Sequence, residues 1–462
     1  MKPELLQVLN EWNQPGLLQH LTSLDETARQ ALETELLGLD LDFLKFLFRS
    51  YQSFQTAGVG SRQIFRTIQP LRDDCCELET ARIFHQSSRA ERFLSEGKAA
   101  VLILAGGMGS RLGHFAPKGT FPITPVTGKS LFQVHCEKLA VLRRHYGVPI
   151  LTCVMTNRAS HAATCAFFEE NDFFGLPASD FFFFPQNEIP ALNPQNGALY
   201  FRSNGQICFG PDGHGGLITA MKSAGAYDFL RRHGVETLNT FHVDNPLVPV
   251  LNEQFLDAHL NRKSEMSSLV IEKIDGMELV GNVVRSGADG ETLRVVEYLD
   301  FPGEFAMETN PAGGLKYWAG SIGVHLIQLD FLERMEAQIR KDPDFLPYHL
   351  PLKKITADLG EVWGIKPERF IFDVLPFAKN PVVGRAGNRD EVFTTLKKSP
   401  EPVRNHLSEL YASWLRRLGA KLPERAVVEI APGFALDFAS LQQRVPEGTV
   451  FRDSQIYLND SK

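Results

Sequence analysis

The sequence has few of the features that mark metal-binding, disulfide-rich or membrane proteins. Its six cysteines form no C-x-x-C pair, so we expect buried free thiols in a reducing compartment rather than a zinc site or a disulfide framework. Its longest apolar runs are far shorter than the ~20 residues that a membrane span needs. The first residues contain no apolar signal segment. Together these absences predict a cytoplasmic protein without a membrane partner.

The chain also lacks an excess of positive charge, because its formal net charge is −7. A general nucleic-acid-binding protein needs a basic face that neutralises phosphates, so we expect no nucleic-acid partner. A small phosphorylated substrate stays compatible with this charge, since a local group of Lys and Arg side chains can lie inside an acidic protein. The hydrophobic fraction of 43% is typical of a globular chain, and 462 residues suggest about two to four domains.

The order of the predicted elements favours an α/β fold. Residues 99–104 form a buried apolar run typical of a strand, and residues 149–156 form a second one. A helical pattern follows each strand, at 130–146 and at 159–170. Alternating strands and helices predict a parallel sheet with crossover helices.

Other segments add helices and make the predicted sheet mixed. Turn signals at 203–205 and 289–290 indicate hairpins. A single helix is predicted over 217–232 and a strand over 237–243, while Asp25 is placed to cap an early helix that reaches residue 37. We therefore divide the chain into a helical N-terminal region, a Rossmann-like α/β domain with a mixed central sheet, and a small C-terminal lobe, over residues 1–95, 96–380 and 381–462.

A glycine-rich segment over residues 104–113 directly follows the first predicted strand, and Pro117-Lys118-Gly119 comes shortly after it. Glycines at such a turn let the backbone approach a ligand, and the exposed N–H groups can bind phosphate oxygens. Arg111 and Lys118 would add positive charge that could follow a triphosphate through a reaction. The segment therefore predicts a phosphate-binding loop.

Two other interpretations of this loop stay open. The spacing of Gly107, Gly109 and Gly113 also resembles the fingerprint of a dinucleotide-binding dehydrogenase. That fold expects an acidic residue after the second strand, whereas residues 156–158 are Thr-Asn-Arg. The second alternative is a structural glycine turn without a ligand.

Several further residues are candidates for a site. The glycine-dense loop 210–216 contains His214 and leads into a helix, so it suits close contact with a base, sugar or phosphate. Asp244 ends a predicted strand, where a carboxylate can hold Mg²⁺ against phosphate oxygens, although Asp-Asn-Pro is also a turn starter. Glu297 alternates with apolar neighbours and faces either a ligand or solvent. Lys397 taken alone is most simply a surface lysine.

At these residues the chain resembles the UDP-sugar pyrophosphorylase family, and within it the UDP-N-acetylglucosamine pyrophosphorylases. The resemblance runs from residue 99 to 398. It rests on motifs in a fixed order, which are Leu104-Ala105-Gly106-Gly107-x-Gly109-Ser110-Arg111-Leu112-Gly113, Pro117-Lys118-Gly119, Lys129-Ser130-Leu131-Phe132-Gln133, Pro211-Asp212-Gly213-x-Gly215-Gly216, Val243-Asp244-Asn245, Gly364-Ile365-Lys366, Phe370-Ile371-Phe372-Asp373 and Phe377-Ala378-Lys379. Several ordered motifs are more specific than any single one.

The resemblance implies a nucleotidyltransferase fold and a role for each matching residue. The nucleotide-binding residues would be Leu104, Ala105, Gly106, Gly107, Gln186 and Gly213. The sugar-binding residues would be His214, Gly281, Glu297, Ser321, Phe370 and Phe372. Asp244 would bind the metal, and the residues that neutralise phosphate charge would be Arg111, Lys118 and Lys397.

The implied activity joins a sugar-1-phosphate to UTP with Mg²⁺ and releases pyrophosphate, with N-acetylglucosamine-1-phosphate as the first expectation for the sugar. The related enzymes often carry Asn where this chain has His214 and Ser321, which leaves glucose-1-phosphate as an alternative. A third hypothesis is a protein that binds a nucleotide sugar as a sensor without catalysing a reaction. The oligomeric state stays open between monomer and dimer.

Overall fold

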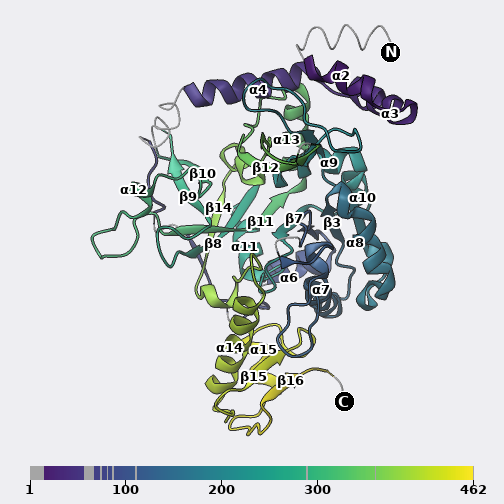
Figure 1. Ribbon diagram of the computed structural model, residues 1–462. Coiled ribbons are helices and arrows are strands. Elements are labelled where there is room, and N and C mark those ends of the chain that lie inside the picture. Colours follow the sequence, from purple (N-terminus) through teal and green to yellow (C-terminus); the bar gives the residue numbers. More distant parts are fainter. Residues whose placement is uncertain are drawn as a thin grey trace. The chain divides into compact units, whose positions relative to one another are not determined.

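The computed structural model of the chain describes residues 15–56, 67–72, 75–80, 82–85, 88–109, 112–287, 290–358 and 360–460 (Figure 1). The chain divides into two compact units, and each is made of separate stretches of sequence. The smaller unit takes Met1–Thr67, Gln186–Leu217 and Lys341–Asp373, and the larger unit takes Ile68–Pro185, Ile218–Arg340 and Val374–Lys462. The boundaries that the sequence suggests at residues 95 and 380 stay a prediction.

One mixed sheet forms the centre of the larger unit. Among the described residues it has ten strands, which are β1 (Cys76–Leu78), β14 (Val382–Ala386), β8 (Met266–Glu272), β11 (Ala319–Gln328), β7 (Thr237–His242), β2 (Ala99–Leu104), β3 (Thr152–Thr156) and β4 (Phe181–Pro185) in spatial order, with β9 (Gly281–Ser286) and β10 (Thr292–Val296) attached beside β11. Strands β7, β2, β3 and β4 are parallel, while β11 runs antiparallel to β7 and β8. The predicted mixed α/β sheet is confirmed.

The strands at the middle of this sheet are fully buried, as their apolar sequences predict. Val101, Leu102 and Ile103 of β2 have no exposed surface. Helices connect and cover the strands, and they are α6 (Ser88–Ser95), α7 (Leu131–Tyr146), α8 (Arg158–Glu170), α9 (Leu217–Ala224), α10 (Ala226–Arg232), α11 (Glu253–Asn261), α12 (Gly303–Ala306) and α13 (Leu329–Lys341). Ser130 caps α7, since its hydroxyl accepts from the Gln133 N–H at 3.1 Å. Because helices cover the sheet, its central strands are continuous apolar runs, which is typical of parallel strands.

The helix predicted over 217–232 is wrong as a single element. Gly225 adopts a left-handed backbone with φ of 81° between α9 and α10. A continuous right-handed helix cannot contain that conformation, so the chain stops and restarts there. The signal was present in the sequence, because glycine adopts positive φ at little steric cost.

The last part of the larger unit contains α14 (Glu401–Arg417), α15 (Phe438–Arg444) and the parallel pair β15 (Val427–Ile430) and β16 (Gln455–Leu458). Glu429 of β15 has 2% of its surface exposed, and its carboxylate accepts from the main-chain N–H groups of Val126 and Thr127, each at 2.8 Å. These contacts join the end of the chain to the segment that leads into α7.

The smaller unit packs three N-terminal helices against short β elements. The helices are α2 (Pro15–Ser23), α3 (Glu26–Leu37) and α4 (Leu41–Thr56), and the strands are β5 (Glu188–Pro190), β6 (Phe209–Pro211), β12 (Leu352–Ala357) and β13 (Gly360–Ile365). Its core includes Leu21, Leu36 and Leu47 from the helices and Leu192 and Ile365 from the β elements. Among the described residues, none of the helices in either unit combines the length and the apolar character of a membrane span.

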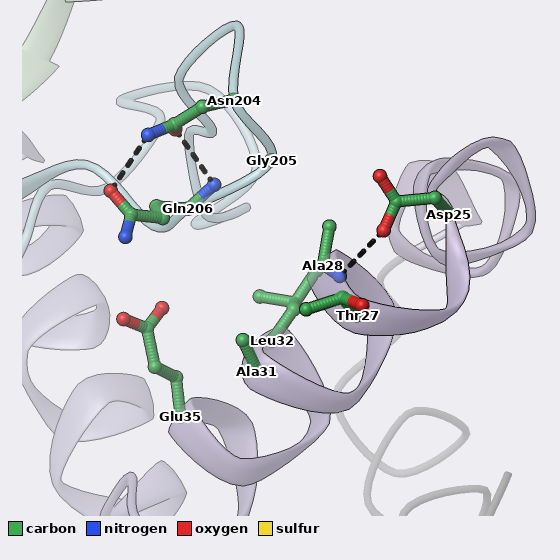
Figure 2. A pocket seen from close by; sticks show the side chains of 9 residues that line it. All are labelled: Asp25, Thr27, Ala28, Ala31, Leu32, Glu35, Asn204, Gly205 and Gln206. Atoms are coloured by element: carbon green, nitrogen blue, oxygen red, sulfur yellow. Dashed lines mark hydrogen bonds between the residues drawn. The ribbon is translucent and has the colours of Figure 1, made fainter.

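A small pocket of the smaller unit lies between α3 and the turn at residues 204–206 (Figure 2). Asp25 caps α3 beside it, because its carboxylate accepts from the Ala28 N–H at 2.8 Å, as the sequence predicts. Across the pocket, Asn204 Nδ2 donates to Gln206 Oε1 at 2.8 Å. None of the residues that line this pocket is a candidate site residue.

Candidate functional site

The described part of the glycine-rich segment, residues 104–109 and 112–113, lies at the carboxyl end of β2. The Ala105 N–H donates to the Met155 carbonyl at 2.8 Å, which continues the sheet by one residue. The Lys118 N–H donates to the Gly107 carbonyl at 3.0 Å, and Asn157 Nδ2 donates to the Gly106 carbonyl at 2.5 Å. These bonds hold residues 104–107, four of the predicted nucleotide-binding residues, at the sheet edge where ligands of open α/β sheets bind. Arg111 lies outside the described residues.

Asn157 occupies the position where the dehydrogenase alternative requires a carboxylate. Its Oδ1 accepts from the Ser160 N–H at 2.6 Å and so caps α8, while its Nδ2 holds the glycine loop. Both the oxygen and the nitrogen of the Asn157 side-chain amide therefore make hydrogen bonds within the protein. This arrangement gives no acidic partner for a ribose at the end of β3 and argues against the dinucleotide-binding interpretation.

Asp244 lies next to the glycine loop. It follows β7 by two residues, and β7 pairs with β2 so that His242 is opposite Leu104. Lys118 Nζ donates to Asp244 Oδ2 at 2.6 Å, with side chains that are 17% and 20% exposed. Burial raises the pKa of the Asp244 carboxyl, but the nearby Lys118, His242 and Lys397 outweigh it and hold that pKa below its ordinary value. The group is therefore an anion at neutral pH.

Lys397 belongs to the same neighbourhood. The Leu396 N–H donates to the Asp244 carbonyl at 3.1 Å, so the chain passes beside the carboxylate just before Lys397. The Lys397 ammonium is exposed and donates to the Leu279 carbonyl at 3.1 Å. The structure thus brings Lys118, Asp244 and Lys397 together at one edge of the sheet, as a charge-neutralising site requires.

The fit of this group to Mg²⁺ depends on how many donors it offers. Among the described residues, no three His, Cys, Asp or Glu side chains gather as a metal cluster. Mg²⁺ usually binds proteins through one or two carboxylates and takes its other ligands from substrate phosphates and water. One ionised carboxylate beside a loop that the sequence predicts to bind phosphate meets that requirement, so Asp244 fits as a single protein ligand.

Two residues that sequence reasoning missed support the turn around Asp244. His135 and Lys138 lie three residues apart on α7, and so on one face of that helix. His135 Nε2 donates to the Val243 carbonyl at 2.9 Å, while Lys138 Nζ donates to the carbonyls of Pro246 and Val248 at 2.6 and 2.9 Å. Burial lowers the pKa of His135 to about 3 and that of Lys138 to about 7. Polar residues on an otherwise apolar helix face were the available signal.

Lys138 makes the stability of the protein depend on pH. Its pKa is about 7 in the folded protein against 10.5 for the ordinary side chain. Between these values the unfolded chain binds more protons, so this group makes stability rise with pH. We expect the melting temperature of the wild type, relative to that of Lys138→Met, to increase from about pH 7 to about pH 9.5. A difference between the two proteins that stays constant over this range would contradict the assignment.

The predicted sugar-binding residues of the larger unit meet beside β11. Ser321 of β11 pairs with Gly281 of β9 and is 8% exposed. A Cβ on Gly281 would lie 2.8 Å from Val295 Cγ1 and 3.7 Å from Glu297 Oε2, so only glycine fits there and the carboxylate is adjacent. Gly323 packs against the His242 ring, where a Cβ would lie 2.6 Å from Cδ2. Gly323 and His242 therefore connect this group to the turn that carries Asp244.

The remaining predicted residues form a second group inside the smaller unit. His214 Nδ1 accepts from the Ile371 N–H at 3.1 Å, which in the neutral ring leaves the proton on Nε2. The His214 ring stacks on Phe370 at 5.1 Å and meets Phe372 edge-on at 5.5 Å, both between ring centroids. Gln186 is 8% exposed at the first position of this unit after β4. The structure thus places Gln186, Gly213, His214, Phe370 and Phe372 in the smaller unit and the other described candidates in the larger one.

Internal packing requires three glycines of the 210–216 loop, which are Gly213, Gly215 and Gly216. A Cβ on Gly213 would lie 2.3 Å from the Arg369 carbonyl oxygen, and one on Gly216 would lie 2.0 Å from Asp212 Oδ1. Asp212 is 4% exposed, and burial raises its pKa to about 7. Sequence reasoning explained these glycines by ligand contact alone and missed the roles of Asp212 and Arg369. Close approach of the backbone of Arg369 and Phe370, and of the Asp212 side chain, is a second reason for glycine at these positions.

Comparison with known proteins places this geometry in a family. The sequence profile of the UTP–glucose-1-phosphate uridylyltransferase family matches residues 44–341. The chain belongs to this family. Its members are nucleotidyltransferases, so the predicted enzyme class is confirmed.

Individual relatives and a solved structure show which branch of the family the chain is similar to. The UDP-N-acetylglucosamine pyrophosphorylase of Saccharomyces cerevisiae is 31% identical over 385 residues, which cover 79% of each chain. A protein of Dictyostelium discoideum named a probable UDP-N-acetylglucosamine pyrophosphorylase is 31% identical over 79% of this chain and 80% of its own. The crystal structure of the Trypanosoma brucei UDP-N-acetylglucosamine pyrophosphorylase shares the fold, with a TM-score of 0.78 at 24% identity over 98% and 97% of the two chains. The predicted resemblance and nucleotidyltransferase fold are confirmed.

Proposed function

We propose that this uridylyltransferase family member joins N-acetylglucosamine-1-phosphate to UTP and releases pyrophosphate. The sugar follows from the UDP-N-acetylglucosamine pyrophosphorylases among its relatives. The observation that supports the transfer chemistry is the Lys118–Asp244 pair at 2.6 Å beside the glycine loop. The six free cysteines support the cytoplasmic location that we propose with this activity.

The reaction needs positioning and charge neutralisation rather than a covalent intermediate. An oxygen of the sugar phosphate forms a bond to the α-phosphorus of UTP, and the bond from that phosphorus to the leaving pyrophosphate oxygen breaks in line. The attacking phosphate is already ionised near neutral pH, so no general base is required.

Each group of the larger unit has a task in this proposal. The glycine loop would orient the triphosphate through main-chain N–H groups, and Lys118, Lys397 and Arg111 would balance the charge that develops on pyrophosphate. Asp244 would hold Mg²⁺, which supplies further charge neutralisation at the phosphate oxygens when it is bound. In the smaller unit, the aromatic group around His214 would contact the sugar.

The test is pyrophosphate release from UTP and Mg²⁺, with N-acetylglucosamine-1-phosphate compared with glucose-1-phosphate. We expect kcat/KM to be at least about tenfold higher with the first sugar, since a pocket that contacts the N-acetyl group discriminates on that scale. Faster release with glucose-1-phosphate would move the assignment to that sugar and point to His214 and Ser321. Binding of UDP-sugar without any release would instead favour the sensor.

A further inference from the structure

The carboxylate that the proposed function assigns to a metal is already occupied by a side chain of the protein. Lys118 Nζ donates to Asp244 Oδ2 at 2.6 Å, and both side chains are mostly buried. Charge-assisted hydrogen bonds of this kind are short and strong, and an ion pair screened from water is worth more than one on the surface. A cation that approaches Asp244 therefore has to compete with the Lys118 ammonium.

We propose that Lys118 keeps Asp244 occupied in the free protein and releases it only when the phosphates of a nucleotide offer the ammonium another anionic partner. Asp244 then takes up a divalent cation together with the nucleotide and not before it. This inference rests on the proposed function, because that function supplies both the nucleotide and the metal.

The course of the Lys118 chain supports such an exchange. The main chain of Lys118 is bonded to Gly107, and its side chain runs along the same glycine, with Cδ 3.7 Å from where a Gly107 Cβ would lie. The side chain thus extends from the phosphate-binding loop to the carboxylate of Asp244. A triphosphate bound at that loop would lie beside the ammonium, which could change partners by a rotation of its own side chain.

The local charge also disfavours a metal before the nucleotide arrives. Asp244 supplies one negative charge, whereas Lys118 and Lys397 both lie close enough to lower its pKa. No further carboxylate joins Asp244 to form a metal cluster within the described parts of the chain. The group therefore carries a net positive charge, and the polyphosphate would reverse its sign.

The test measures Mn²⁺ binding to the purified full-length protein without nucleotide, with free Mn²⁺ counted by its paramagnetic resonance signal. Lys118→Met removes the ammonium that contacts Asp244. Lys397→Met removes an equal charge that lies near Asp244 but donates to the Leu279 carbonyl instead. We expect Lys118→Met to bind Mn²⁺ at least about tenfold more tightly than the wild type, and Lys397→Met at most about threefold.

Equal changes in the two variants, or no change in Lys118→Met, would overturn the inference. If Lys118→Met does not fold, Lys118→Gln replaces it in the same comparison. Adding Asp244→Asn to Lys118→Met should abolish the gain, and a gain that persists would place the ion elsewhere and also overturn the inference. Pyrophosphate release by the wild type is measured separately, so failure of the proposed function is seen independently of the Mn²⁺ result.

Discussion

Lys118→Ala is expected to lower kcat for uridylyl transfer by roughly 10²–10³-fold, the range for removing one group that stabilises charge in a transition state. The ammonium lies between the glycine loop and Asp244, where it can follow negative charge onto the leaving pyrophosphate. Because both side chains of the pair are mostly buried, loss of the ammonium should also lower the melting temperature, so kcat is compared at a temperature where both proteins are folded. Steady-state kinetics with both substrates saturating would measure the loss.

The matched control is Lys379→Ala. Lys379 is an exposed lysine of the same unit, and its main-chain N–H donates to Glu265 Oε2 at 2.8 Å, a bond that the substitution leaves intact. We expect a wild-type kcat for this variant. Near-normal turnover of Lys118→Ala, or an equal loss in Lys379→Ala, would refute the role given to Lys118.

Features that depend on local sequence could be predicted. The apolar run at 99–104 specifies a buried strand, and the glycines after it specify the end of that strand. The sequence predicts Asp244 at the carboxyl end of a strand, and in the structure it follows β7, which pairs with β2. Each inference used neighbours within a few residues, together with the rule that ligands bind at this edge of a parallel sheet.

Features that depend on distant partners could not be predicted. His135 bonds to the carbonyl of Val243, 108 residues away, and Lys138 bonds to that of Val248, 110 residues away. Nothing in the helical pattern of α7 identifies those acceptors. Likewise, the smaller unit is assembled from segments that begin at residues 1, 186 and 341, which no local composition change reveals.

Gly213→Ala is expected to destabilise the protein more than Gly225→Ala does. Both glycines have a positive φ, of 82° and 81°, but ψ is 170° at Gly213 and 16° at Gly225. Alanine costs about 1–2 kcal/mol in the left-handed region that Gly225 occupies, whereas the conformation of Gly213 is essentially restricted to glycine. At Gly213 the new Cβ would also lie 2.3 Å from the Arg369 carbonyl oxygen, whereas at Gly225 nothing lies within 4 Å.

Two effects separate the variants, because both the backbone strain and the crowding are larger at Gly213. Overpacking adds about 1–3 kcal/mol, so the melting temperature of Gly213→Ala should fall below that of Gly225→Ala. The crowding atom is the carbonyl oxygen of Arg369, the residue before Phe370, whose ring stacks on His214. A backbone shift that relieves this clash would therefore also displace the aromatic rings. We therefore expect KM for the sugar phosphate to rise in Gly213→Ala and not in Gly225→Ala. Equal melting temperatures would mean that the loop at 213 yields without cost.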